Sequence, residues 1–226
     1  SVKIVENLVQ RTPEWHDFRL LGIGGSEIGA VLEISPYQTP LQLFLEKTGA
    51  IKRKDISKNP NVRRGVKYED HIANIINDYF GDHGTSLCGI HEEYDFMRVS
   101  FDLVSSTRFY EIKAIGDTQW EWVKQHGPHP WYMAQAQYQG IVAEKLGLEG
   151  KLVYWRQVET PEGTKEEVMI FDVVISEETR TMIVEAAQKF WDLIERGVPP
   201  QADPKRDALS EIEMTDEQLE IWTAIA

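Results

Sequence analysis

The sequence has little cysteine and no long apolar run. Cys88 is the one cysteine among 226 residues, so no disulfide bond can form within the chain. No apolar stretch approaches the roughly 20 residues of a membrane-spanning helix, and the first residues show no basic segment followed by an apolar one. These absences exclude a disulfide framework and predict no association with a membrane. We therefore expect a reducing, cytoplasmic location.

Several common signatures are also missing. The chain contains no P-loop, no glycine-rich dinucleotide fingerprint and no internal repeat. Its six histidines are scattered, and prolines beside His126 and His129 prevent the regular helical spacing of a zinc site. We therefore assign neither a nucleotide-binding fold of these types nor a zinc site.

Positive charge is scarce and unevenly placed. The formal net charge is −13, which argues superficially against nucleic acid, because nucleic-acid-binding proteins usually present a basic surface. Basic residues nevertheless gather at 52–54 and 63–67. A local basic groove on an acidic protein is compatible with DNA and limits non-specific binding. The net charge is thus weak grounds for excluding DNA.

The composition fits one globular domain with an acidic end. Because 42% of the residues are hydrophobic, we expect residues 1–202 to form a single domain. Residues 203–226 carry seven acids against Lys205 and Arg206. A capping box at Thr215 to Gln218 predicts a short helix in this acidic tail.

The most informative stretch is Met97 to Ile115, MRVSFDLVSSTRFYEIKAI. Side chains alternate along a strand, so Glu111 and Lys113 share one face and Tyr110, Ile112 and Ala114 share the other. A Ser-Ser-Thr turn precedes this strand. If residues 99–103 and 109–115 pair in antiparallel fashion, a second carboxylate, that of Asp102, lies beside Glu111.

Two carboxylates and one ammonium in this arrangement suit metal-dependent phosphodiester hydrolysis. Neighbouring carboxylates repel each other, and a hard divalent cation such as Mg²⁺ relieves the repulsion. Of two other acid-x-lysine triplets, Glu149 to Lys151 follows a glycine-flanked turn and Asp203 to Lys205 lies in a proline-containing loop, so neither is expected within an apolar strand that follows an upstream acid. The alternative for Glu111 and Lys113 is a solvated strand face with an ordinary ion pair.

A second candidate site precedes this stretch. Thr12 and Pro13 predict the start of a helix that carries Arg19. The glycine-rich turn 22–27 follows, and a helix is expected from Ser26 to Leu32. The free N–H groups of that helix, together with Arg19, would form an anion pocket. The alternative is a plain capped turn in which Ser26 is the N-cap residue and Glu27 complements the helix dipole.

Further elements follow from periodicity. Glu69 lies one turn before Ile72 on a predicted helix, where it faces the carboxylate pair or is simply solvated. Gln135 lies on an otherwise aromatic face of a helix predicted to end near Gly147. Strands 152–157 and 167–175 are expected to form a hairpin. Ser176 caps a long helix, and the predicted core stripe of that helix includes Met182.

Four segments in order resemble the phage-type alkaline 5′→3′ exonucleases related to lambda exonuclease and YqaJ, within the PD-(D/E)xK nuclease superfamily. They are WHDFRLLGIGGSEIGAVL, RRGVKYEDHI, VSFDLV followed by YEIKA, and WYMAQAQYQ. The resemblance implies an α/β (α+β) nuclease domain with a restriction-endonuclease-like core, a mixed central sheet flanked by helices. Phe101 departs from the family pattern, which has proline before the aspartate.

The resemblance also implies a metal site. Asp102, Glu111 and the carbonyl of Ile112 match the ligands of Mg²⁺, for which Mn²⁺ is expected to substitute. Glu69 matches a helical acid that completes the site directly or through water.

Two further groups of residues match the family. Lys113 matches the lysine that positions the attacking water, and Gln135 matches a glutamine that assists it. Arg19, Ser26 and Ser100 match a pocket that grips the 5′-terminal phosphate. By resemblance these residues complete the catalytic and substrate-binding site.

The implied function is a Mg²⁺-dependent exonuclease that digests one strand of linear double-stranded DNA from its 5′ end. Mononucleotides would be released, and a 3′ single strand would remain for recombination by strand annealing. The implied setting is a phage or prophage protein in the cytoplasm of a bacterial host, a homotrimer ring with a single-strand annealing recombinase as partner. Two alternatives remain open: an endonuclease of the same superfamily, of resolvase or restriction type, and a noncatalytic DNA-end-binding module.

Overall fold

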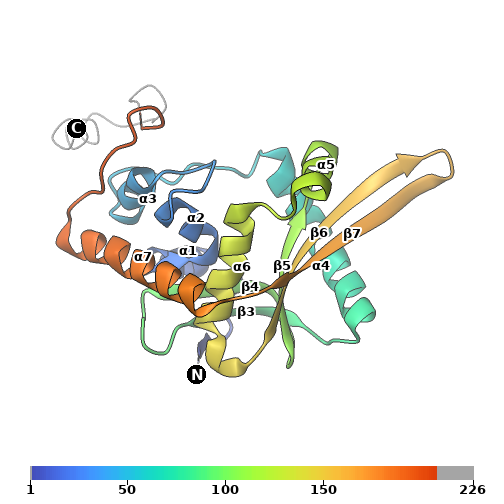
Figure 1. Ribbon diagram of the computed structural model, residues 1–226, viewed down its shortest axis with the longest axis horizontal. Helices are drawn as coiled ribbons and strands as arrows, with labels where there is room; N and C mark the ends of the chain where they lie inside the picture. Colours follow the sequence, from blue (N-terminus) through green and yellow to red (C-terminus); the bar gives the residue numbers. More distant parts are fainter. Residues whose placement is uncertain (1, 208–226) are drawn as a thin grey trace.

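The computed structural model describes residues 2–207 as helices packed around one mixed sheet (Figure 1). The sheet has seven strands in the order β1-β3-β4-β5-β6-β7, with β2 beside β4. Only β5 and β6, and β2 and β4, pair in parallel. The strands are β1 (Lys3–Val5), β2 (Ile23–Gly24), β3 (Thr85–Ile90), β4 (Met97–Val104), β5 (Arg108–Ala114), β6 (Glu149–Thr160) and β7 (Gly163–Val173).

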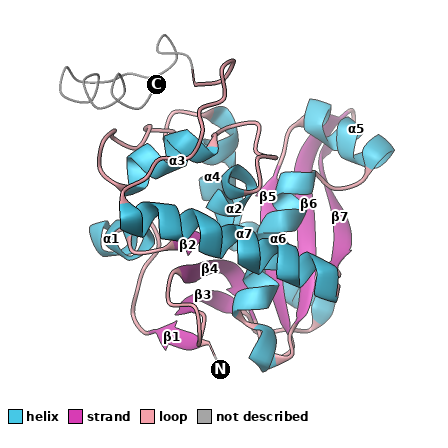
Figure 2. Cartoon of the chain, turned by 60° about the vertical axis from the view of Figure 1, so that its left-hand side comes forward, coloured by secondary structure: helices cyan, strands magenta, loops and turns pink. Residues whose placement is uncertain are grey.

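Helices flank this sheet, as Figure 2 shows. They are α1 (Pro13–Leu20), α2 (Ile28–Val31), α3 (Pro40–Lys47), α4 (Pro60–Phe80), α5 (Asp117–His126), α6 (Pro130–Val142) and α7 (Glu177–Arg196). Two short 3₁₀ turns occupy Gly25–Glu27 and Glu144–Leu146. None of the helices among residues 2–207 is both long and apolar enough to cross a membrane. The prediction of a mixed central sheet flanked by helices is confirmed.

The alternation predicted for β5 divides the core into two layers. Tyr110 and Ala114 pack against Ile72 and Ile76 of α4. The opposite face of β5 points toward α6, where Glu111 meets the side chains of two glutamines. The strand therefore buries apolar residues on one side and polar, chemically useful ones on the other.

The antiparallel pairing of β4 and β5 is also confirmed. Leu103 pairs with Tyr110 and Val104 with Phe109, so continuing this register places Asp102 beside Glu111. The turn at residues 105–107 joins the two strands. The backbone N–H of Ile112 donates to Asp102 Oδ2 at 2.8 Å, which ties the two strands together at the carboxylate pair.

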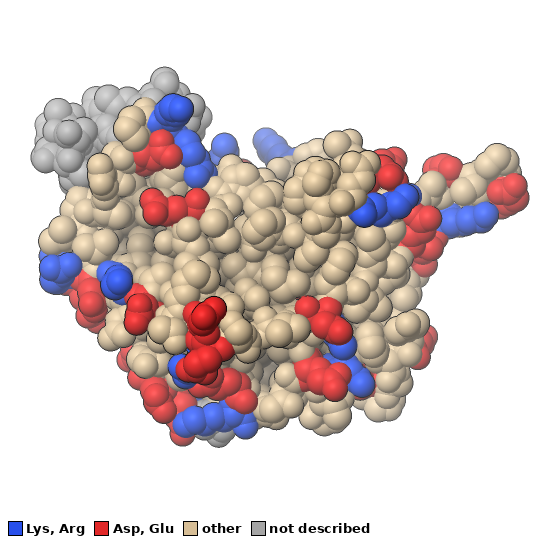
Figure 3. All heavy atoms as spheres, in the orientation of Figure 1, with Lys and Arg blue, Asp and Glu red and all other residues tan. Residues whose placement is uncertain are grey.

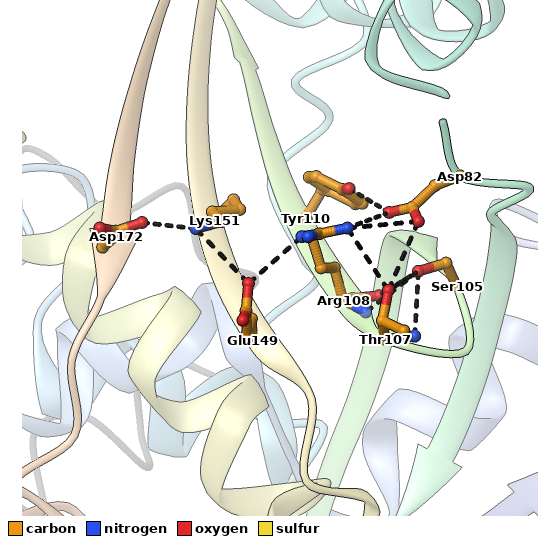
Figure 4. A network of polar contacts seen from close by, with 8 residues as sticks. All are labelled: Asp82, Ser105, Thr107, Arg108, Tyr110, Glu149, Lys151 and Asp172. Carbon is orange, nitrogen blue, oxygen red and sulfur yellow. Dashed lines mark hydrogen bonds and ion pairs between the residues drawn. The ribbon is translucent and has the colours of Figure 1, made fainter. Parts of the chain in front are cut away.

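A polar network fixes the start of β5 (Figure 4). Asp82, just after α4, accepts hydrogen bonds from the Tyr110 hydroxyl and from Arg108. Arg108 Nε also donates to Glu149 Oε2 at 3.2 Å, at the first residue of β6. Each exposed ion pair contributes little alone. Together they connect α4, β5 and β6, and so hold the register of the strand that carries Glu111 and Lys113.

The predicted Ser26–Leu32 helix requires a correction. The segment begins with the 3₁₀ turn Gly25–Glu27, and Gly24 occupies the N-cap position. The Glu27 carboxylate accepts a hydrogen bond from Gly24 N at 2.8 Å, while the Ser26 hydroxyl accepts one from Arg19. The interpretation of Ser26 as the N-cap residue was therefore wrong, because Gly24 holds that position and its backbone N–H is bound by the Glu27 carboxylate three residues later.

Other boundaries also differ from the expectations. The hairpin β6–β7 is longer than predicted and projects beyond the body of the domain (Figure 1). Its outer part pairs through backbone bonds that need no buried side chains. Helix α6 ends at Val142, before the expected Gly147. Met182 is 53% exposed, so its assignment to the core stripe of α7 was wrong.

Residues 203–207 lie against the start of α3. Asp207 Oδ1 accepts a hydrogen bond from the hydroxyl of Thr39, the N-cap residue of α3, at 2.5 Å. Gln42 Nε2 donates to the carbonyl of Arg206 at 3.1 Å. The predicted terminal helix at residues 215–218 lies outside the described residues, and the division at residue 203 stays a prediction.

Gly150 provides a test of the packing between β5 and β7. A Cβ at this position would lie 2.4 Å from Phe109 Cζ and 2.7 Å from Val173 Cβ. We expect Gly150→Ala to lower the free energy of unfolding by about 1–3 kcal/mol, the usual cost of overpacking. Urea denaturation measures this change.

Gly65 of α4 is the matched control, because a Cβ there meets nothing within 4 Å. Alanine favours a helix interior by about 0.8–1 kcal/mol over glycine, so Gly65→Ala should raise stability. Equal stability changes in the two variants would contradict the described packing.

Candidate active site

A cavity of about 190 Å³ lies between α1, α6 and the strands β4 and β5. Eight of the nine candidate residues line it; they are Arg19, Ser26, Ser100, Asp102, Glu111, Ile112, Lys113 and Gln135. The ninth, Glu69, lines an adjoining cavity that also contacts Asp102 and Ile112. The candidate residues, which are spread over the sequence from residue 19 to residue 135, thus come together around two adjoining cavities.

Glu111 is the most enclosed of these groups, with 1% of its surface exposed. Its Oε1 accepts a hydrogen bond from Gln135 Nε2 at 2.7 Å, and its Oε2 accepts one from Gln139 Nε2 at 2.6 Å. Lys113 Nζ lies 2.5 Å from Oε1. A buried carboxylate needs such partners, and both glutamines come from α6.

Lys113 lies among groups that favour its charged form. Besides the ion pair with Glu111, its Nζ donates to Gln135 Oε1 at 3.2 Å and lies 4.4 Å from the centre of the Tyr132 ring. Burial disfavours the ammonium, but Glu111, Tyr132 and Asp102 together outweigh burial and raise the pKa of Lys113. At neutral pH this lysine is therefore a cation and a hydrogen-bond donor.

The surroundings of Asp102, in contrast, favour its neutral form. Burial and the negative charge of Glu111 raise the pKa of Asp102 well above its ordinary value, against the opposing effect of Lys113. Glu69 adds a smaller effect in the same direction, although its own carboxylate forms an ion pair with Arg11. The partly buried Asp102 thus lies beside the buried Glu111, whose negative charge disfavours the charged form of Asp102.

These acids match the chemistry of a hard cation. Among residues 2–207, no three Asp, Glu, His or Cys side chains come together in a metal-binding cluster. The donors available are two carboxylates and the carbonyl of Ile112, with Glu69 in the adjoining cavity. An all-oxygen set that leaves room for water is the kind that Mg²⁺ favours.

At the other end of the cavity, Arg19 is held by a buried acid. Its Nη2 donates to Glu27 Oε1 at 2.8 Å and to Ser26 Oγ at 2.9 Å. Lys47 Nζ lies 2.7 Å from Glu27 Oε2. One buried carboxylate thus joins two cations, and the cluster carries a net positive charge toward Ser26. The anion pocket predicted at this turn stays a prediction, and this arrangement is compatible with it.

Ser100 faces the same end of the cavity. Its Oγ accepts hydrogen bonds from Trp15 Nε1 at 2.9 Å and from the Cys88 thiol at 3.4 Å. A hydroxyl has two acceptor positions and one proton, so the proton of Ser100 is the part that suits a bound oxygen.

Arg98 also lines the cavity. Its Nη1 donates to the Phe18 carbonyl at 3.0 Å, whereas its buried Nε has no hydrogen-bond partner among the described residues. A second guanidinium therefore lines the same cavity as that of Arg19.

A groove of about 630 Å³ adjoins this end. Trp15 lies in its wall with five basic side chains, those of Arg11, Arg53, Lys54, Arg63 and Lys67. On the face seen in Figure 3, by contrast, basic and acidic side chains are interspersed. The local basic groove expected from the sequence is present.

Sequence reasoning missed several contributors. Gln139 had a readable signal, because it lies four residues after Gln135 and hence on the same helix face. Arg98 had one too, since it shares the period-two face of Ser100 and Asp102. Glu27 and Lys47 belong to separate elements, and no local pattern predicts their contact.

Comparison with known proteins agrees with this architecture. The structure of an alkaline exonuclease, LHK-Exo from Laribacter hongkongensis, matches with a TM-score of 0.66 at 19% identity, covering 83% of this chain and 94% of that one. The complex of LHK-Exo with dAMP matches with a TM-score of 0.65 at the same identity and coverage. The chain therefore has the alkaline exonuclease fold.

Sequence comparison gives the family. The model of the YqaJ-like viral recombinase domain matches residues 14–146, and the chain belongs to this family. Uncharacterized protein YqaJ of Bacillus subtilis (strain 168) is 24% identical over 213 residues, which cover 88% of this chain. The chain spans 62% of the length of that relative. The resemblance inferred from the four sequence segments is confirmed.

The Glu27 cluster gives a pH-dependent prediction. Burial opposes the charge of Glu27, but Lys47 and Arg19 outweigh it and lower its pKa from 4.5 to about 2. A depressed pKa contributes stability above pH 4.5 that is lost as the pH falls through about 2. We expect Glu27→Gln to cost about 3 kcal/mol at pH 6, with a smaller difference from wild type at pH 3.

Urea denaturation at a series of pH values measures this difference. The exposed acid Glu185 of α7 supplies a control, Glu185→Gln, whose stability should stay near that of wild type throughout. A Glu27→Gln deficit that is constant from pH 6 to pH 3 would show that the carboxylate charge does not stabilise the cluster.

Proposed function

We propose that this chain is a deoxyribonuclease, a Mg²⁺-dependent 5′→3′ exonuclease that digests one strand of linear double-stranded DNA to mononucleotides. The observation that supports the proposal is that one cavity is lined both by Arg19 and Ser26 and by the carboxylates of Asp102 and Glu111. A 5′ phosphate at one end would place the next phosphodiester at the other. The family and fold support the same activity.

The residues present fit Mg²⁺, with Mn²⁺ as a substitute. Asp102, Glu111 and the Ile112 carbonyl would hold the ion, with Glu69 nearby to bind it directly or through water. The ion supplies a Lewis acid that polarises a phosphoryl oxygen and lowers the pKa of a bound water. Its charge would also relieve the repulsion that raises the pKa of Asp102.

Lys113 and Gln135 would act on the attacking water and the phosphate. Because its pKa is raised, Lys113 stays protonated and serves as a donor that offsets negative charge in the transition state. Gln135 lies between Lys113 and Glu111, so it orients both groups. Gln139 holds the second oxygen of Glu111.

The anion pocket would set the polarity of digestion. Arg19, Ser26 and Ser100 would grip the terminal 5′ phosphate, with Arg98 as a further cation. A 3′ end has no such phosphate, so only a 5′ end would place its first phosphodiester at the carboxylates. The basic groove beside Trp15 would accommodate the duplex. The solved complex of LHK-Exo with dAMP is in keeping with a mononucleotide product.

The wider biological role is proposed from family membership. The 3′ single strand would serve recombination by strand annealing, with a single-strand annealing recombinase as partner. The protein would act as a homotrimer ring around DNA, as a phage or prophage product in the bacterial cytoplasm.

Removal of the Lys113 ammonium tests the catalytic assignment. We expect Lys113→Ala to lower mononucleotide release from linear duplex with Mg²⁺ by about 10²–10³-fold, the usual effect of losing an electrostatic contact in the transition state. Lys151→Ala is the matched control, since Lys151 lies on the neighbouring strand and pairs with Asp172. The control should retain wild-type activity.

Two results would contradict this assignment. Undiminished release by Lys113→Ala would remove the lysine from the mechanism. Wild-type binding of DNA ends without hydrolysis in Mg²⁺ or Mn²⁺ would favour a noncatalytic end-binding module instead.

A separate variant tests the phosphate pocket. Wild type should hydrolyse duplexes with 5′-phosphate ends about 10–100-fold faster than those with 5′-hydroxyl ends, because hydrogen bonds to a charged group are worth about 1.5–3 kcal/mol. Arg19→Ala should erase most of this ratio. Arg19→Lys should keep part of it, since lysine retains the charge without the fork of donors.

The ratio is measured within one protein, so it is independent of the fraction that folds. Unchanged discrimination between the two ends in Arg19→Ala would contradict the assignment of the pocket.

A further inference from the structure

A second cavity, of about 340 Å³, opens beside the catalytic one. The two cavities share four lining residues, Arg19, Ser26, Lys113 and Gln135. Arg19 and Ser26 belong to the proposed phosphate pocket, and Lys113 and Gln135 belong to the proposed hydrolytic site. The second cavity therefore opens along the span between the two phosphates of a terminal nucleotide.

Aromatic side chains line this cavity. They are Tyr37, in the loop before α3, and Trp131 and Tyr132, at the start of α6. The rings of Tyr37 and Trp131 lie 6.2 Å apart at 88°, and those of Trp131 and Tyr132 lie 5.8 Å apart at 63°. The hydroxyls of Tyr37 and Tyr132 are 3.4 Å apart. The three rings form one connected wall.

The wall is held in place from behind. A Cβ at Gly29 of α2 would lie 3.3 Å from Trp131 Cβ, so glycine allows α2 to pack closely against this tryptophan. The Nζ atom of Lys113 lies over the ring of Tyr132 and so covers one face of that ring. Tyr37, in contrast, is 63% exposed although it borders the cavity. Its ring offers the open surface of the wall.

We propose that this aromatic cavity binds the base of the 5′-terminal nucleotide, which stacks on Tyr37 once it has left the duplex. The inference rests on the proposed exonuclease function. With its 5′ phosphate at Arg19 and its 3′ phosphate at Lys113, this nucleotide has its sugar between the two cavities and its base directed into the aromatic one.

Stacking also suits the task. An exonuclease must accept every base, and stacking on an aromatic ring is tolerant of sequence because every base has a π face. Capture of the terminal base would also favour its separation from the complementary strand. The cavity would thus help to pull each new 5′ nucleotide into the site.

The test compares two linear duplexes that both carry a 5′ phosphate. One has an ordinary 5′-terminal nucleotide, and the other has an abasic tetrahydrofuran residue at that position. Single-turnover hydrolysis of the first phosphodiester is measured with Mg²⁺, and equilibrium binding of both ends is measured with Ca²⁺. Wild type should favour the end with a base about 10-fold in hydrolysis, in binding or in both.

Tyr37→Ala should lose this preference, because hydrolysis or binding of the ordinary end falls while that of the abasic end stays the same. Tyr37→Phe should keep it, because the ring remains. Tyr79 of α4 is the matched control: it is also an exposed tyrosine, at 74%, and Tyr79→Ala should behave as wild type.

The outcomes separate the two proposals. Equal treatment of both ends by wild type, with normal hydrolysis, would overturn the base subsite and leave the exonuclease intact. A base-dependent binding preference that Tyr37→Ala removes, in a protein that hydrolyses neither end, would support the subsite and overturn the nuclease. Retention of the full preference by Tyr37→Ala would overturn the role of Tyr37.

Discussion

The repulsion between the buried carboxylate of Glu111 and the partly buried one of Asp102 is the constraint on which the site depends. Asp102 and Glu111 come from neighbouring strands, and the antiparallel register of β4 and β5 places them side by side. Burial raises the free energy of both charges. Lys113 and two glutamines offset the cost for Glu111, while Asp102 relies on one backbone N–H. Because Asp102 has fewer partners than Glu111, its negative charge is less well offset, and a hard cation bound to the two carboxylates would offset it.

At the part of the cavity lined by Arg19, two positive charges are held together by one carboxylate. Arg19 and Lys47 are two buried cations, and Glu27 joins them. The two ends are packed against each other through Gly25, since a Cβ there would lie 3.3 Å from Gln139 Cγ and 3.5 Å from Gln135 Cγ. A larger residue at position 25 would push the turn Gly25–Glu27 away from the two glutamines that hold Glu111. The distance between the proposed grip and the hydrolytic site thus depends on this contact.

The sequence predicted those features that follow from local periodicity. Alternation along residues 110–114 was sufficient to assign the faces of β5, and the Ser-Ser-Thr turn was sufficient to propose its pairing with β4. It did not predict Gly24 as the N-cap of the 3₁₀ turn, because the Glu27 carboxylate that binds the Gly24 N–H is held by Arg19 and Lys47, which lie on two other helices. Met182 was wrongly assigned to the core because the apolar stripe of α7 is wider than the surface that packs against the domain, and Met182 lies at the edge of that stripe. Tertiary contacts decided each of these cases.

We propose that one cavity anchors a 5′ phosphate and hydrolyses the adjacent phosphodiester. The most direct measurement uses linear duplexes labelled at the 5′ or the 3′ end, incubated with wild-type protein and Mg²⁺ beside covalently closed circular DNA. We expect early release of the 5′ label as a mononucleotide, late release of the 3′ label and intact circles. Internal cuts in the circles, or early release from the 3′ end, would contradict it.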